Sequence, residues 1–99
     1  MTKEGEIKQH IKKILNDLEV WYCMPTTAGF GRSGVSDFIC CVNGRFLAIE
    51  AKRGDLQPTA LQKRELDRIS KSGGGAIVVN GANIDKFEMY MKKIIGLGK

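Results

Sequence analysis

Apolar residues recur along this chain with two different periods, which separate helices from strands. In three segments they recur every three or four residues, the spacing of a helix that buries one side. These segments are 3–18, 58–72 and 83–95. Four shorter runs are rich in β-branched, aromatic and other apolar residues, as strands are. These runs are 19–24, 37–42, 45–52 and 76–79.

The connections between these segments predict how the strands are arranged. Asn43-Gly44 separates the second and third strands and strongly favours a two-residue hairpin, so we expect these strands to be antiparallel. The helix at 58–72 then forms the crossover to the fourth strand. Together the connections predict an α/β fold in which helices flank a mixed central sheet. A length of 99 residues suits a single domain over 1–99.

Three charged residues stand at the ends of strands that are otherwise apolar. Asp37 opens the second strand, while Glu50 and Lys52 close the third, where alternation places both on the same face. Counting outward from the Asn43-Gly44 turn pairs Asp37 with Glu50 across the hairpin. Charges in buried strands are costly unless they are paired or bind a metal. Alone, Glu50 and Lys52 also fit an ordinary ion pair, and Asp37 a turn residue.

Four motifs occur along the chain in an order that resembles a known nuclease family. They are an acid in the first helix, G-V-x-D at 34–37, E-x-K at 50–52 and a glutamine in the following helix. This order resembles the PD-(D/E)XK nuclease superfamily and, more closely, its virus-type replication-repair nuclease (VRR-NUC) domain. The matching stretches are 4–15, 34–37, 44–54 and 62–75. The resemblance implies a restriction-endonuclease-like core. Ser36 stands where the family usually has proline, which is not a ligand, so we expect the chemistry to survive.

The resemblance implies catalytic roles for the three charged residues and a divalent metal beside them. The carboxylate oxygens of Asp37 and Glu50 suit Mg²⁺ or Mn²⁺ rather than a soft metal. Similarity to the family adds the backbone carbonyl of Ala51 as a third ligand. Lys52, next to that cation, would orient the attacking hydroxide or stabilise charge on the phosphate.

Two helical residues extend this candidate catalytic site, and each has an alternative role. The family places a functional glutamine at Gln62, but Thr59 to Gln62 also matches a capping box. Glu4 lies three residues before Ile7, at the head of the apolar side of the first helix, and best matches the helix acid of the family. Glu6 is a nearby competitor, and an acid in the first turn also favours the helix dipole.

The chain carries a net charge of +5, from 16 basic and 11 acidic residues, which favours a polyanionic partner such as DNA. We expect Arg32 and Arg53, which lie nearest to the candidate acids, to contact phosphates. We also assign Lys8 and Lys12 to DNA binding, on sides of the first helix away from Glu4.

These features together predict a metal-dependent endonuclease acting on DNA. Small standalone members of the family occur in phages and suggest a branched substrate, such as a four-way (Holliday) junction. A two-fold homodimer would cut such a junction twice. The last helix is a candidate dimer interface through four residues, Phe87, Met89, Tyr90 and Met91. The alternatives are a catalytically silent DNA-binding module with the same fold, or an interaction protein whose basic surface is incidental.

Cysteine placement and hydropathy indicate a reduced, intracellular protein. Cys40 and Cys41 are adjacent and point to opposite faces of a strand, so they are poorly placed to bond each other. With Cys23, we expect them to be reduced core residues rather than disulfides or zinc ligands. No apolar run approaches the ~20 residues of a membrane helix, and the N-terminus lacks a signal-peptide pattern. We therefore expect a cytoplasmic location (the host cytoplasm if phage-encoded) and no membrane partner.

Overall fold

The computed structural model describes residues 3–26 and 34–97 and contains the seven predicted elements in the predicted order. The helices are α1 (Glu4–Asp17), α2 (Ala60–Lys71) and α3 (Ile84–Leu97). The strands are β1 (Trp21–Cys23), β2 (Phe38–Val42), β3 (Arg45–Ala51) and β4 (Gly75–Val79). Observed and predicted ends differ by a few residues. Within the described part, no helix is both long enough and apolar enough to cross a membrane.

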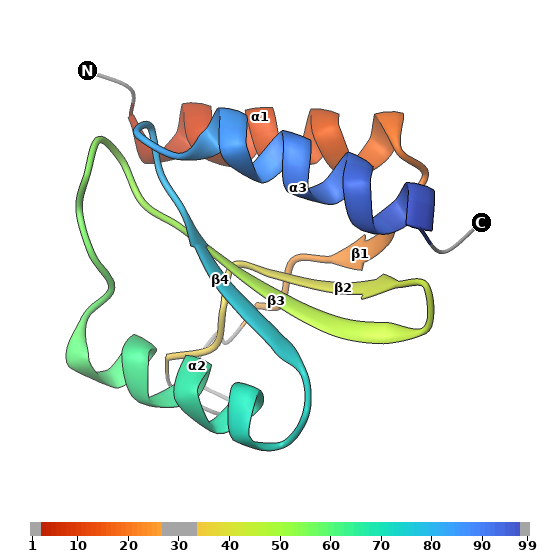
Figure 1. Cartoon of the computed structure of the whole chain (residues 1–99). Coiled ribbons are helices and arrows are strands. Elements are labelled where there is room, and N and C mark those ends of the chain that lie inside the picture. Colours follow the sequence, from red (N-terminus) through yellow and green to blue (C-terminus); the bar gives the residue numbers. More distant parts are fainter. Residues whose placement is uncertain (1–2, 27–33, 98–99) are drawn as a thin grey trace.

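The four strands form one mixed sheet in the order β1-β2-β3-β4. The pairs β1–β2 and β2–β3 are antiparallel, whereas β3 and β4 are parallel because α2 carries the chain back between them. Helices α1 and α3 lie side by side on one face of the sheet, and α2 lies on the other (Figure 1). The predicted α/β fold with a mixed central sheet is therefore confirmed.

The hairpin between β2 and β3 has the register predicted from its turn. Asn43 and Gly44 have positive φ angles of 51° and 80°, as a type I′ turn requires. The ladder then runs without a bulge from the turn to the last pair, Phe38 with Ile49. One more step in the same register places residue 37 opposite residue 50, at the open end of the hairpin.

The hydrophobic core lies between the sheet and the pair of helices α1 and α3. Its largest fully buried apolar side chains come from both layers: Ile7, Ile11, Leu15, Phe38, Cys40, Ile49, Val79 and Met91. The strand residues among them recur at every second position, because alternate side chains of a strand point to the same face. Residues at the intervening positions, Glu50 among them, face the side of the sheet that carries α2.

Only one of the three cysteines belongs to this core, so the prediction is wrong for the other two. Cys40 is buried, and burial raises the pKa of its thiol to about 12, which leaves the thiol inert. Cys23 and Cys41 are exposed, because they alternate with residues that face the core and therefore point away from it. All three are free thiols.

Helix α3 contributes more to the core than its predicted role at a dimer interface implies. Phe87 and Met91 are 5% and 0% exposed and belong to the core cluster. Met89 and Tyr90 are 71% and 46% exposed. The proposed interface therefore reduces to Met89 and Tyr90, because the other two side chains are already covered within the chain.

Candidate active site

Asp37 is anchored at the open end of the hairpin by the backbone of β3. Its Oδ2 accepts a hydrogen bond from the Ala51 N–H at 2.8 Å. The N–H and C=O of one strand residue point to the same side of the strand, so the Ala51 carbonyl faces the side on which Asp37 lies. The carboxylate and the carbonyl, both assigned to a metal from the sequence, therefore border the same space.

Glu50 is a carboxylate that is only 2% exposed. Its Oε2 accepts a hydrogen bond from Gln62 Nε2 at 3.1 Å and lies 3.8 Å from Lys52 Nζ. Its Oε1 is buried and has no hydrogen-bond partner among the described residues. Burial, followed by the charge of Asp37, raises the pKa of Glu50 to about 8, against the opposing effect of Lys52. A buried carboxylate oxygen without a donor is a position that a cation would satisfy.

The donor atoms at this end of the sheet fit a hard divalent cation. They are carboxylate oxygens and a backbone carbonyl, a set that suits Mg²⁺ or Mn²⁺ rather than zinc. In residues 3–26 and 34–97 there is no cluster of three or more His, Cys, Asp or Glu side chains that could bind a metal. Because two carboxylates and one carbonyl are the donors at this end of the sheet, a metal bound here would be held by Asp37, Glu50 and the Ala51 carbonyl. Water molecules would complete its coordination.

Gln62 caps α2 and also contacts Glu50. Its Oε1 accepts a hydrogen bond from the Thr59 N–H at 2.9 Å, and its N–H donates to Thr59 Oγ1 at 3.3 Å. These two bonds complete the capping box at the start of α2. Its Nε2 donates to Glu50. The roles are compatible because an amide carries separate donor and acceptor atoms, and the cap fixes the orientation in which the amide reaches Glu50.

Lys8 lies beside Glu4 and Asp37. The predicted position of Lys8, on a side of α1 away from Glu4, is therefore wrong. Its Nζ is 3.5 Å from Glu4 Oε2 and 3.3 Å from Asp37 Oδ1. Burial lowers the pKa of Lys8, but the charges of Asp37 and Glu4 outweigh burial and raise it overall. The spacing of four residues from Glu4 was the available signal. Through Lys8, Glu4 is linked to Asp37, whereas the competing Glu6 is exposed.

Of the other basic residues assigned to DNA binding, Arg53 and Lys12 lie within the described residues. Arg53 is exposed in the turn directly after Lys52. Lys12 is half-buried, one helical turn after Lys8, and forms no ion pair with any residue in the described ranges. Arg32 lies outside the described residues. Arg53 is therefore the exposed cation that stands nearest in sequence to the candidate catalytic lysine.

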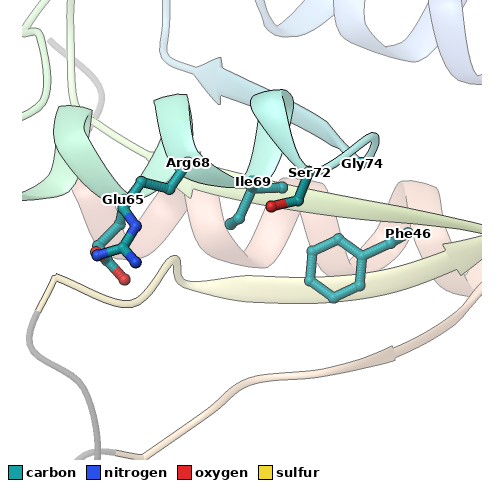
Figure 2. Close-up of a pocket in the computed structure, with 6 residues that line it drawn as sticks. All are labelled: Phe46, Glu65, Arg68, Ile69, Ser72 and Gly74. Atoms are coloured by element: carbon teal, nitrogen blue, oxygen red, sulfur yellow. The ribbon is translucent and has the colours of Figure 1, made fainter.

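A groove between α2 and β3 opens on the same face of the sheet as Glu50. Its volume is about 390 Å³, and its described lining residues are Phe46, Glu65, Arg68, Ile69, Ser72 and Gly74. Figure 2 shows the Phe46 ring at one end of the groove, with Arg68 and Glu65 at the other. Phe46 is 45% exposed, and four residues of strand place it about 13 Å from Glu50. The groove was not predictable from a motif, because it depends on how α2 packs.

Comparison with solved structures found two chains with the same fold. One, described as "VRR_NUC domain", has a TM-score of 0.72 and 26% sequence identity, and the match covers 97% of each chain. The other, described as "VRR_NUC domain protein", has a TM-score of 0.72 and 23% identity over 99% of this chain and 92% of that one. No protein-family model and no curated protein matched the sequence. Both structural matches extend over nearly the whole chain.

Proposed function

We propose that this chain, which shares its fold with two chains described as VRR_NUC domains, is a nuclease of that kind, an endonuclease that hydrolyses DNA with the help of Mg²⁺ or Mn²⁺. One observation carries the proposal. Asp37, Glu50 and Lys52 meet at one end of the sheet, and Glu50 Oε1 is buried there with no donor from the described residues. Leaving a buried carboxylate oxygen without a donor costs free energy, and a bound cation would offset that cost.

The residues at this end of the sheet supply what phosphodiester hydrolysis requires. When bound, the metal would activate a water molecule and neutralise charge on the phosphate. Asp37 and Glu50 would hold that ion, and their orientations are fixed by the Ala51 N–H and the Gln62 amide. The side chain of Lys52 is 13% exposed, and its ammonium group lies 3.8 Å from Glu50 Oε2. From there it would orient the attacking hydroxide or stabilise negative charge on the phosphate.

The surface beside the acids supports a nucleic acid as the substrate. The net charge of +5 favours a polyanion, and Arg53 is exposed next to the site. The groove between α2 and β3 adds the exposed ring of Phe46 and the cation of Arg68. An aromatic ring beside a cation is typical of surfaces that bind single-stranded nucleic acid. In this proposal the strand to be cut runs from the acids into the groove.

Cleavage of labelled DNA tests this proposal directly. Linear duplex, flap and four-way junction DNA are incubated with Mg²⁺, Mn²⁺ or EDTA, using wild type, Asp37→Asn and Lys52→Ala. Asp17→Asn and Lys13→Ala are matched controls, because they remove the same charges from an exposed ion pair of 2.8 Å on α1.

We expect cleavage that requires metal and falls by at least about a hundredfold in the two site variants. The two controls should cut as wild type does. Binding without cleavage in any metal would instead identify a catalytically silent DNA-binding module.

We further propose that the substrate is branched DNA, such as a four-way junction, and that a homodimer cuts it. The support is the resemblance to small standalone members of the family, together with the two-fold symmetry that two matched cuts require. The exposed side chains of Met89 and Tyr90 on α3 are the candidate interface. Sedimentation should show a wild-type dimer and a Met89→Lys monomer. A monomeric wild type that cuts all three DNA structures equally would contradict this proposal.

A further inference from the structure

Lys8 places a positive charge between two carboxylates that come from different parts of the chain. Its Nζ is 3.5 Å from Glu4 on α1 and 3.3 Å from Asp37, which leads into β2. The side chains of Lys8 and Asp37 are 30% and 20% exposed, so this contact lies partly out of solvent. Its location is the one that a cation shared by Glu4 and Asp37 would take.

We propose that Lys8 takes the place of a second metal ion, so that this site binds one divalent cation per chain. The inference rests on the proposed metal-dependent nuclease function. Asp37 is the carboxylate that would have to bridge two ions, and both of its oxygens already have partners. Oδ2 accepts the Ala51 N–H, and Oδ1 faces Lys8.

The lone pairs of Asp37 limit what else it can bind. Each carboxylate oxygen offers about two acceptor positions, so Asp37 can still bind one ion that it shares with Glu50. The side of Asp37 that faces Glu4 is filled by the ammonium group of Lys8. A second ion shared by Glu4 and Asp37 would have to displace that group.

The charges around Asp37 lead to the same conclusion. When all of them are ionised, three carboxylates and two ammonium groups leave one net negative charge: Glu4, Asp37, Glu50, Lys8 and Lys52. One divalent cation converts this to one net positive charge, which suits a DNA phosphate. A second would leave three positive charges within a few ångströms, and like charges repel strongly in a partly buried site.

A lysine ammonium group differs from a second metal ion because it is covalently attached to the chain and cannot dissociate. Lys8 acts on Asp37 and Glu4 rather than on DNA, so it is a positioning residue. It holds the Asp37 carboxylate in place before the metal binds. The site then fills in a single step as the metal concentration rises.

Binding of Mn²⁺ to the full chain tests this role without measuring cleavage. Free Mn²⁺ is counted by its electron paramagnetic resonance signal during titration of wild type, Lys8→Met and Lys12→Met. Lys8→Met keeps most of the side-chain length and removes the charge. Lys12→Met makes the same change one turn along α1, at a lysine without an ion pair to the described residues. We expect one bound ion per chain for wild type and Lys12→Met, and two for Lys8→Met.

Two results would overturn the role of Lys8: two ions in wild type, or one ion in a folded Lys8→Met protein. Lys8→Gln, a second neutral variant, carries the same expectation of two ions if Lys8→Met does not fold. Lys8→Arg keeps the charge and should bind one ion. A wild type that binds no Mn²⁺ would overturn the metal-dependent function itself. One ion in both wild type and the neutral variants would overturn only the inference about Lys8.

Discussion

Replacing Glu50 with glutamine should remove most of the pH dependence of stability between pH 5 and pH 8 in the absence of metal. In the unfolded chain this carboxylate loses its proton near pH 4.5, whereas in the fold the pKa of Glu50 is about 8. Between these values the folded chain holds a proton that the unfolded chain has lost, so the free energy of unfolding falls as pH rises. At about 1.4 kcal/mol per pKa unit, the fall reaches about 3 to 4 kcal/mol. Glutamine has nearly the same shape and no charge to bury.

Urea unfolding in EDTA at the two pH values measures this effect. Glu6→Gln, which changes an exposed acid on α1, should follow wild type. Adding Mg²⁺ at the higher pH should restore the stability of wild type but not raise that of Glu50→Gln, because the proposed ion would stabilise the ionised carboxylate in the fold. Parallel loss of stability in wild type and Glu50→Gln would refute the reasoning, since burying this carboxylate would then carry no cost.

Three further tests address separate parts of the site. Thr59→Ala should lower the free energy of unfolding by about 1 kcal/mol, because it removes a helix cap, and should leave cleavage unchanged. Gln62→Ala should lower the free energy of unfolding at least as much and should also slow cleavage, because only this variant removes the hydrogen bond to Glu50. Equal cleavage rates in these two variants would contradict a role for the amide in the site. Ser36→Ala should stabilise the fold by about 1 to 2 kcal/mol in the same assay, because the hydroxyl is buried with no hydrogen-bond partner in the described chain; lower stability would show that the hydroxyl is bonded in solution. Phe46→Ala should weaken binding of single-stranded DNA about tenfold by fluorescence anisotropy, since stacking contributes roughly 1 to 3 kcal/mol per base, and unchanged affinity would place the strand elsewhere.

The elements and their arrangement were predictable because each depends on a local signal. Asn43-Gly44 was sufficient to predict the hairpin, since both residues tolerate the positive φ angles that the turn needs. This hairpin turn determines the register of the two strands, and the register places Asp37 opposite Glu50. The convergence of these two acids could therefore be inferred from the order of residues along two strands. Glu50 and Lys52 share a face for the same local reason, the alternation of side chains.

Other features of the site were not predictable, because they depend on contacts between distant segments. Lys8 has an acid one turn away on α1, but its second partner, Asp37, comes within reach only when α1 packs against the sheet. Gln62 matches two patterns, and only its orientation shows that one amide satisfies both. Helix α3 is apolar on more than one side, so its sequence does not tell which methionine is buried. Packing buries Met91 and leaves Met89 exposed.

The fold holds both acids in place through contacts with other elements of the chain. The Ala51 N–H and Lys8 fix Asp37, and the capped amide of Gln62 fixes Glu50. Each of these anchors comes from a different element, so binding a metal, as proposed, would require little rearrangement of the chain. A metal would have to displace the proton on Glu50, whose pKa of about 8 lies close to neutral pH. At pH 7 that displacement costs only about 1 to 2 kcal/mol, which is small compared with the attraction between a divalent cation and two carboxylates. The same burial that destabilises the metal-free fold therefore leaves one oxygen unsatisfied, and that oxygen is the one a metal can use.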